Sequence, residues 1–184
     1  MNICASAETF MVSLKPNLMC TCLRPQTFSN GLLRETGEWV INFPSADILW
    51  QVDYCGQVSG RDVDKFAATG LTPLPALHVR APLIKECPIN VECRVRELAS
   101  FGSHDLFVGD ILAIHADEEV LDEEERPNPR LMRVVALCNR EYWQPSTYLA
   151  RLRFSQSNPP GTVRGLAPEA SPGSAPGKTE EASE

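Results

Sequence analysis

The chain has 184 residues, 43% of them hydrophobic, which is enough for one domain with its own core. Its 24 acidic and 17 basic residues give a formal net charge of −7, which excludes a general attraction to nucleic acid or to an anionic membrane. The sequence has neither an apolar run long enough to cross a bilayer nor a basic start followed by an apolar signal core. We therefore expect a cytoplasmic protein that holds any anion in a local site.

Seven cysteines lie mostly in apolar, strand-like surroundings, where a free thiol serves as a small hydrophobic side chain. Their odd number fits a reducing compartment. Cys20 and Cys22 share one face of a predicted strand, but no Cys-x-x-Cys pair or His cluster completes a zinc ligand set. We therefore expect no metal site.

Strand and helix signals alternate in the first part of the chain. The apolar residues 18–23, bounded by prolines, predict the first buried strand. A short helix over residues 31–36 follows, with Thr27 or Ser29 at its start and Gly37 as its stop. Residues 39–43 then predict a second strand, closed by a proline.

Two further helices are predicted before a proline-rich connection at residues 72–88. The spacing of apolar residues over 45–54 is helical, with a hydroxyl near the N-cap. Ser59-Gly60-Arg61-Asp62 has the form of a capping box and opens a third helix that ends near Gly70.

The second half predicts two longer strands, 91–98 and 106–116, joined around Gly102. Residues 106–116 have little polar face, which indicates a central strand covered on both sides. An acidic loop and one more strand at 131–137 follow. From residue 155 onward the chain is too poor in bulky apolar residues to fold, so we expect a domain at 1–154 and a disordered tail at 155–184.

The two hydroxyl-bearing helix starts are the first candidate site. Unpaired N–H groups and the positive end of the helix dipole suit such a start to phosphate. Arg24, Arg61 and Lys65 lie nearby in sequence, and Lys65 falls about one and a half turns into the third predicted helix. Ordinary capping with solvated basic neighbours is the alternative interpretation.

His104 is the second candidate, because it lies in a Gly-Ser-His-Asp turn that enters the predicted central strand. An imidazole there would assist proton movement near neutral pH. The alternative is a solvated turn histidine without a catalytic role.

The order of motifs along residues 2–148 resembles the flavin reductase-like family that includes flavoredoxin. Each motif alone is weakly specific, whereas five in the same order and spacing are specific. They are CLRP at 22–25, ETGEWVIN at 35–42, CGQVSGRDVDKF at 55–66, APLIKECP at 81–88 and GSHDLFVG at 102–109.

This resemblance implies a mainly β fold with short helices, an antiparallel FMN-binding split β-barrel of Greek-key type. It also implies a homodimer that holds FMN non-covalently near the subunit interface. The implied phosphate-binding residues are Ser29, Ser59, Gly60 and Lys65. The implied neighbours of the isoalloxazine ring are Ala7, Glu8, Thr9, Cys22, Leu23 and Arg24, with His104 beside the flavin.

Two departures from the family pattern bear on the expected function. The family has one more strand before the position of Met1, and we hypothesise that the natural start lies upstream, so a native N-terminus at Met1 by mass spectrometry would refute this. Glu8 stands where relatives often carry an aromatic residue, and a carboxylate near the ring should oppose reduction to an anionic flavin.

The function implied is that of an oxidoreductase moving electrons from NADH or NADPH to free flavin, ferric chelate or a partner protein such as an oxygenase. One alternative is a flavoredoxin-type electron carrier without its own nicotinamide site. Another is a flavin-free interaction module, which applies if the N-terminal truncation is real.

Overall fold

The computed structural model describes residues 1–145, 149, 152–153 and 156. The chain divides into two units, Met1–Ser146 and Thr147–Glu184, and the helices and strands of the described residues belong to the first. The tail predicted to be disordered lies outside the described residues, apart from Gln156. The domain boundary at residue 154 stays a prediction.

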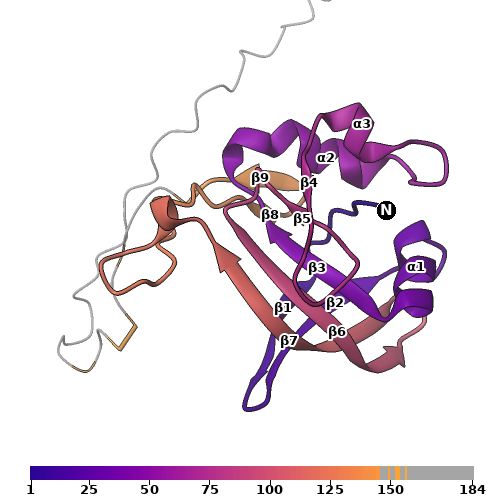
Figure 1. The fold of residues 1–184 in the computed structure, drawn as a ribbon, viewed down its shortest axis with the longest axis horizontal. Helices are drawn as coiled ribbons and strands as arrows, with labels where there is room; N and C mark the ends of the chain where they lie inside the picture. Colours follow the sequence, from indigo (N-terminus) through magenta and orange to yellow (C-terminus); the bar gives the residue numbers. More distant parts are fainter. Residues whose placement is uncertain (146–148, 150–151, 154–155, 157–184) are drawn as a thin grey trace, which may run out of the picture. The chain divides into compact units, whose positions relative to one another are not determined.

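A five-stranded antiparallel sheet is the main element, with the order β1-β2-β7-β6-β3 (Figure 1). In this order β7 is the middle strand, as the sequence predicted. The longest ladder joins β7 to β6, and a tight turn connects the two strands. The strands are β1 (Thr9–Leu14), β2 (Asn17–Leu23), β3 (Glu38–Phe43), β6 (Ile89–Ser100) and β7 (Asp105–Ala116).

The strand predicted at residues 18–23 is confirmed as β2, but it is the second strand of the chain and not the first, because β1 was not predicted. β1 pairs with β2 as an edge hairpin, and Thr9, one of the implied neighbours of the ring, is its first residue. Its apolar side chains face outward, with Phe10 55% and Met11 50% exposed. The sequence therefore lacks the alternation of buried and exposed residues that marks a half-buried strand.

The helix predicted over residues 31–36 is confirmed as α1 (Phe28–Thr36), which begins three residues earlier. Thr27 accepts a hydrogen bond from the Asn30 N–H, and Gly37 ends the helix at φ 66°, a left-handed conformation that glycine adopts without strain. The predicted helix at 45–54 is a 3₁₀ turn, η1 (Ala46–Ile48), followed by α2 (Leu49–Gln57).

The third helix begins five residues later than the capping box predicted, as α3 (Lys65–Thr69). The Asp64 carboxylate caps it by accepting from the N–H groups of Phe66 and Ala67, at 3.1 and 3.2 Å. Ser59 instead accepts from the Arg61 N–H within a turn. Because a carboxylate competes well for helix N–H groups, the later acidic residue sets the start. Lys65 is therefore the first residue of its helix and does not lie one and a half turns into it.

Short elements fill the connections. The proline-rich segment contains β4 (Pro73–Leu74) paired with β5 (Leu83–Ile84), and the acidic loop contains η2 (Glu118–Val120). The strand predicted at 131–137 is wrong for most of its length. The N–H groups of Leu131 and Met132 both donate to the Asn128 carbonyl in a turn, and the strand there is β8 (Ala136–Cys138), paired with β9 (Glu141–Trp143).

Three clusters of buried apolar side chains form the core of the described residues, and one of them includes Val91 and Cys93 of β6. One cluster lies under α1, with Leu23, Leu33 and Phe107, and another lies between α2, α3 and β5, with Ile48 and Ile84. Phe107 is fully buried, but farther along β7 Ile114 is 61% exposed, so only the first half of this strand is covered as predicted. None of the helices in the described ranges is long and apolar enough to cross a membrane.

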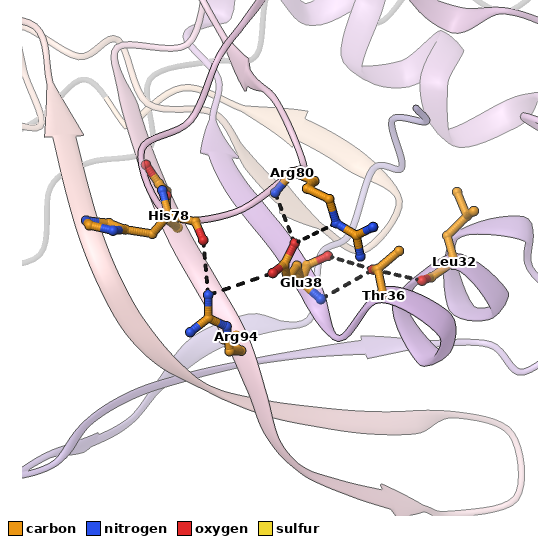
Figure 2. A network of polar contacts seen from close by, with 7 residues as sticks. Leu32, Thr36, Glu38, His78, Arg80 and Arg94 are labelled. Carbon is orange, nitrogen blue, oxygen red and sulfur yellow. Dashed lines mark hydrogen bonds and ion pairs between the residues drawn. The ribbon is translucent and has the colours of Figure 1, made fainter.

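The loop at residues 75–82 is fastened to the sheet by a polar network (Figure 2). Glu38 accepts from the Arg80 N–H at 3.0 Å and from its guanidinium at 3.3 Å, and it pairs with Arg94. Arg94 in turn donates to the His78 carbonyl at 3.0 Å. One carboxylate of β3 thus holds this loop through both its backbone and its side chains.

Candidate cofactor site

The N-terminal segment, residues 2–8, connects the elements that carry the predicted site residues (Figure 1). Asn2 donates to the Ser29 hydroxyl at the start of α1, at 2.7 Å. The Ile3 carbonyl accepts from Lys65 of α3, and the Glu8 carbonyl accepts from the N–H of Cys22 in β2. Residues distant in the sequence are thereby brought into one region.

The start of α1 and the turn at residues 59–62 are neighbours. A Cβ added at Gly60 would approach Phe28 Cδ1 to 2.9 Å and would clash with the side chain of Asn2. Arg61 spans the junction, because its guanidinium donates to the Gln26 carbonyl at 3.2 Å and lies 5.6 Å from the centre of the Phe28 ring. The two predicted helix starts therefore meet, although only α1 is a helix there.

Asn2 occupies this junction with one polar atom unpaired. Its amide nitrogen donates to Ser29, whereas its Oδ1 is buried and has no partner among the described residues. A buried carbonyl oxygen without a donor is costly, and ordinary protein sites seldom leave one. The junction therefore offers an acceptor, Oδ1, and a hydroxyl proton on Ser29 that is not used in the bond from Asn2.

Lys65 is placed differently from the phosphate-binding role that the resemblance implies. The side chain is 5% exposed, and its ammonium donates to the carbonyls of Ile3 and Cys55, both at 2.7 Å. Two of its three N–H donors are thus committed to backbone. The ammonium ties the N-terminal segment to α2.

Arg61 and Asn2 are site residues that sequence reasoning did not select. Arg61 had been noted only as a basic neighbour, and nothing marked Asn2, whose role depends on contacts 27 residues away. An open cleft of about 330 Å³ adjoins the junction. Two carboxylates, Asp62 and Asp64, contribute to its lining and disfavour an anion inside it. The groups suited to an anion are those where this turn meets α1, the Ser29 hydroxyl and the Arg61 guanidinium.

The predicted ring-binding residues form a second group. Residues 7–9 lie along the end of β2, because Thr9 pairs with Thr21 and the Cys22 N–H donates to the Glu8 carbonyl at 3.0 Å. Three hydroxyls cluster beside them, with Thr21 Oγ1 lying 3.1 Å from Ser6 Oγ and 3.3 Å from Thr9 Oγ1. Burial raises the pKa of the Cys22 thiol, and the Glu8 carboxylate raises it further.

His104 lies in the turn between β6 and β7, close to the end of β2. The next residue, Asp105, pairs with Leu23. The imidazole is partly buried, and its Nδ1 is 3.0 Å from the Ser103 hydroxyl. The predicted neighbour Leu23 is therefore adjacent to this turn, and the shared site stays a prediction.

Comparison with known proteins identifies the family of the chain. Residues 2–144 match the model of the flavin reductase like domain. The chain belongs to the flavin reductase-like family. An uncharacterized protein of Archaeoglobus fulgidus is 33% identical over 117 residues, which cover 63% of this chain and 66% of that protein. This chain thus spans just under two-thirds of the length of that relative.

Solved structures of the family agree. Flavoredoxin of Desulfovibrio vulgaris (Miyazaki F) is 32% identical, with a TM-score of 0.78 over 85% of each chain. An FMN-binding protein from Thermus thermophilus, with bound 1-cyclohex-2-enone, is 29% identical, with a TM-score of 0.71 over 80% of this chain and 81% of the other. These likenesses confirm the predicted fold class, the antiparallel split barrel of the flavin reductase-like family.

Proposed function

We propose that the chain binds FMN non-covalently and serves as a cytoplasmic flavin-dependent oxidoreductase that accepts electrons from NADH or NADPH. Its electrons would pass to free flavin, ferric chelate or a partner protein. Membership of the flavin reductase-like family supports the class of activity. The observation that carries the proposal is the meeting of the α1 start with the turn at residues 59–62 around the unpaired Asn2 oxygen.

The donor set at this junction fits a phosphate with an attached polyol. The Ser29 hydroxyl, the Ser59–Gly60 backbone, the Arg61 guanidinium and the N-terminus of a nine-residue helix are all groups that bind phosphate oxygens. The unpaired Asn2 Oδ1 requires a hydrogen-bond donor, and a ribityl hydroxyl is one. FMN carries both kinds of group.

In this proposal Lys65 supports the site mainly from behind. With two of its N–H groups bonded to carbonyls, it has one left for a phosphate oxygen. Its larger contribution is to hold residues 2–8 against α2, which keeps Asn2 at the junction. Loss of Lys65 should therefore affect folding at least as much as affinity.

The second group of residues would receive the ring. Residues 7–9 and the strand end Cys22, Leu23 and Arg24 would line the ring, and His104 lies in the turn next to Leu23. FMN, when bound, supplies hydride acceptance and electron transfer. The protein contributes binding, orientation and exclusion of water, and a negative charge on Glu8 would oppose the reduction of the ring.

A carrier without a nicotinamide site is the second candidate function. It is favoured by the 32% identity to a flavoredoxin, whose TM-score is higher than that of the Thermus thermophilus protein. The exposed apolar side chains of β1, including Phe10 and Met11, support a homodimer in either case. A partner such as an oxygenase would receive electrons only if the chain is the NADH- or NADPH-dependent oxidoreductase.

Binding is tested by fluorescence titration of FMN into the purified chain. We expect saturable quenching at one FMN per chain, about tenfold weaker for Ser29→Ala because a hydrogen bond to a charged group is lost. Arg61→Gln should weaken binding by a similar factor. Arg96→Gln is the matched control, since Arg96 is an exposed arginine paired with Asp110 on the sheet. No quenching by the wild type would instead favour the flavin-free interaction module.

Anaerobic stopped-flow mixing of the FMN-loaded chain with NADH or NADPH separates the two candidate functions. Bleaching of the flavin absorbance at a rate that saturates with nicotinamide concentration supports the reductase. Absence of bleaching at millimolar nicotinamide, with full reduction by dithionite, supports the carrier.

A further inference from the structure

Asp105, the first residue of β7, is a buried carboxylate that no predicted role includes. It is 1% exposed, and its two oxygens accept hydrogen bonds from three side chains. Ser100 donates to Oδ1 at 2.6 Å, and Asn30 and Arg34 both donate to Oδ2 at 2.7 Å. A buried carboxylate that accepts three hydrogen bonds is held in one position.

These partners come from the elements that carry the proposed cofactor contacts. Asn30 follows Ser29 in the first turn of α1, and its amide also reaches the Leu23 carbonyl at the end of β2, at 3.4 Å. Ser100 and Asp105 face each other across the turn that contains His104. One carboxylate therefore fixes the Ser29 helix start, the strand end at Leu23 and the His104 turn relative to one another.

Two of the partners of Asp105, Asn30 and Arg34, are also hydrogen-bonded to each other. Arg34 donates from Nε to the Asn30 Oδ1 at 2.9 Å, so the amide that bonds to Asp105 is oriented from both ends. Its donors are a hydroxyl, an amide and a guanidinium, none of which loses its proton near neutral pH. Hydrogen bonds from Ser100, then Arg34 and Asn30, lower the pKa of Asp105 to about 2, so the arrangement is constant across the physiological range.

We propose that Asp105 is a positioning residue for the cofactor site: it holds the Ser29 helix start and the His104 turn in the arrangement that binds FMN, without touching FMN itself. This inference rests on the proposed function. It goes beyond a stabilising role, because it requires that the contribution of Ser29 to FMN affinity depends on Asp105.

A double-mutant cycle on FMN affinity tests that dependence. Ser29→Ala should weaken FMN binding about tenfold in the wild-type background but less than about threefold in the Asp105→Ala background. Asp110→Ala is the matched control, since Asp110 is a carboxylate of the same strand with an exposed arginine partner. In that background the effect of Ser29→Ala should stay about tenfold. Asp105→Asn replaces Asp105→Ala if the latter does not fold.

Hydrogen exchange of the ligand-free chain provides a second readout. Asp105→Ala should accelerate exchange at residues 28–31 and 101–104 together, with residues 113–116 of the same strand unchanged. An additive cycle, or acceleration in only one of the two segments, would overturn the role of Asp105 while leaving FMN binding in place. If the wild type binds no FMN, the proposed function fails and the positioning role fails with it.

Discussion

Two carboxylates are buried at opposite ends of the β6–β7 ladder, and different partners hold them. Asp105 pairs with Ser100 beside the turn, and its hydrogen bonds come from side chains of α1 and β6. Glu92 pairs with Ala113 toward the other end and is fully buried. It accepts from two backbone N–H groups of a loop and from His115. The first carboxylate joins regular elements, whereas the second fastens a loop.

The difference extends to pH. Burial alone would raise the pKa of Glu92, but hydrogen bonds from the Leu77 N–H, from His115 and from the His78 N–H outweigh it, so the pKa is lowered. Side-chain hydrogen bonds lower the pKa of Asp105 to about 2. Both carboxylates are therefore charged at neutral pH, and Asp105 at the proposed cofactor end stays charged down to about pH 2.

Removal of the loop anchor should have the largest effect. Glu92→Ala leaves the N–H groups of Leu77 and His78 without an acceptor and opens a cavity, so we expect a loss of about 3 kcal/mol in the free energy of unfolding. Urea denaturation measures it. Glu97→Ala, at an exposed position of the same strand, should change stability by less than about 0.5 kcal/mol. Equal effects of the two substitutions would contradict the anchoring role.

Lys65 is a buried cation, and like the two carboxylates it is held by hydrogen bonds of its charged group. Lys65→Met keeps the apolar stem but leaves the carbonyls of Ile3 and Cys55 without their donor, which should cost about 2 kcal/mol of unfolding free energy. Lys85→Met, at an exposed lysine, is the control. A variant with wild-type stability but greatly weakened FMN binding would restore Lys65 as a phosphate ligand.

His115 should contribute less than the carboxylate it contacts. Its Nε2 lies 2.7 Å from Glu92 and the ring is partly exposed, so His115→Leu removes one of three hydrogen bonds. We expect a loss of about 1 kcal/mol, together with faster proteolysis within residues 77–80. His78→Leu is the control, because only the backbone of His78 joins the network. If His78→Leu frees the loop as much as His115→Leu does, the ring of His115 is not an anchor.

The smallest expected effects are on how steeply the stability of the protein falls at acidic pH. Because the folded pKa of Glu92 lies below its usual 4.5, its stabilisation is complete above pH 4.5 and is lost as pH falls through the folded value. For Asp105 the loss occurs between 3.8 and about 2. Stability measured at successive pH values should therefore fall less steeply just below pH 4.5 in Glu92→Gln, and less steeply below 3.8 in Asp105→Asn. If stability falls with pH at the same slope in both variants and the wild type, the lowered pKa values of the two carboxylates are contradicted.

The sequence predicted elements with local signals and missed those that depend on distant contacts. The Thr27 and Gly37 caps of α1 and the two long strands follow from residue type and apolar pattern alone. Strand β1 was missed because its apolar side chains are exposed, and the start of α3 was misplaced because a later carboxylate, Asp64, caps it.

The site was predicted in part for the same reason. Ser29 could be selected because hydroxyls mark phosphate-binding helix starts, Gly60 followed from the resemblance to the family, and the structure brings the two together. The contacts of Asn2 and Asp105 span 27 and 75 residues, and no local pattern announces them. Burial of Lys65 depends on the packing of residues 2–8, which the sequence does not encode locally.

A crystal structure of the chain with FMN is the most direct test of the central claim. We predict that the phosphate lies within hydrogen-bond distance of the Ser29 hydroxyl and the Arg61 guanidinium, with Asn2 Oδ1 accepting from the ribityl chain. FMN bound elsewhere, with the Asn2 amide still on Ser29 and the junction closed, would contradict it.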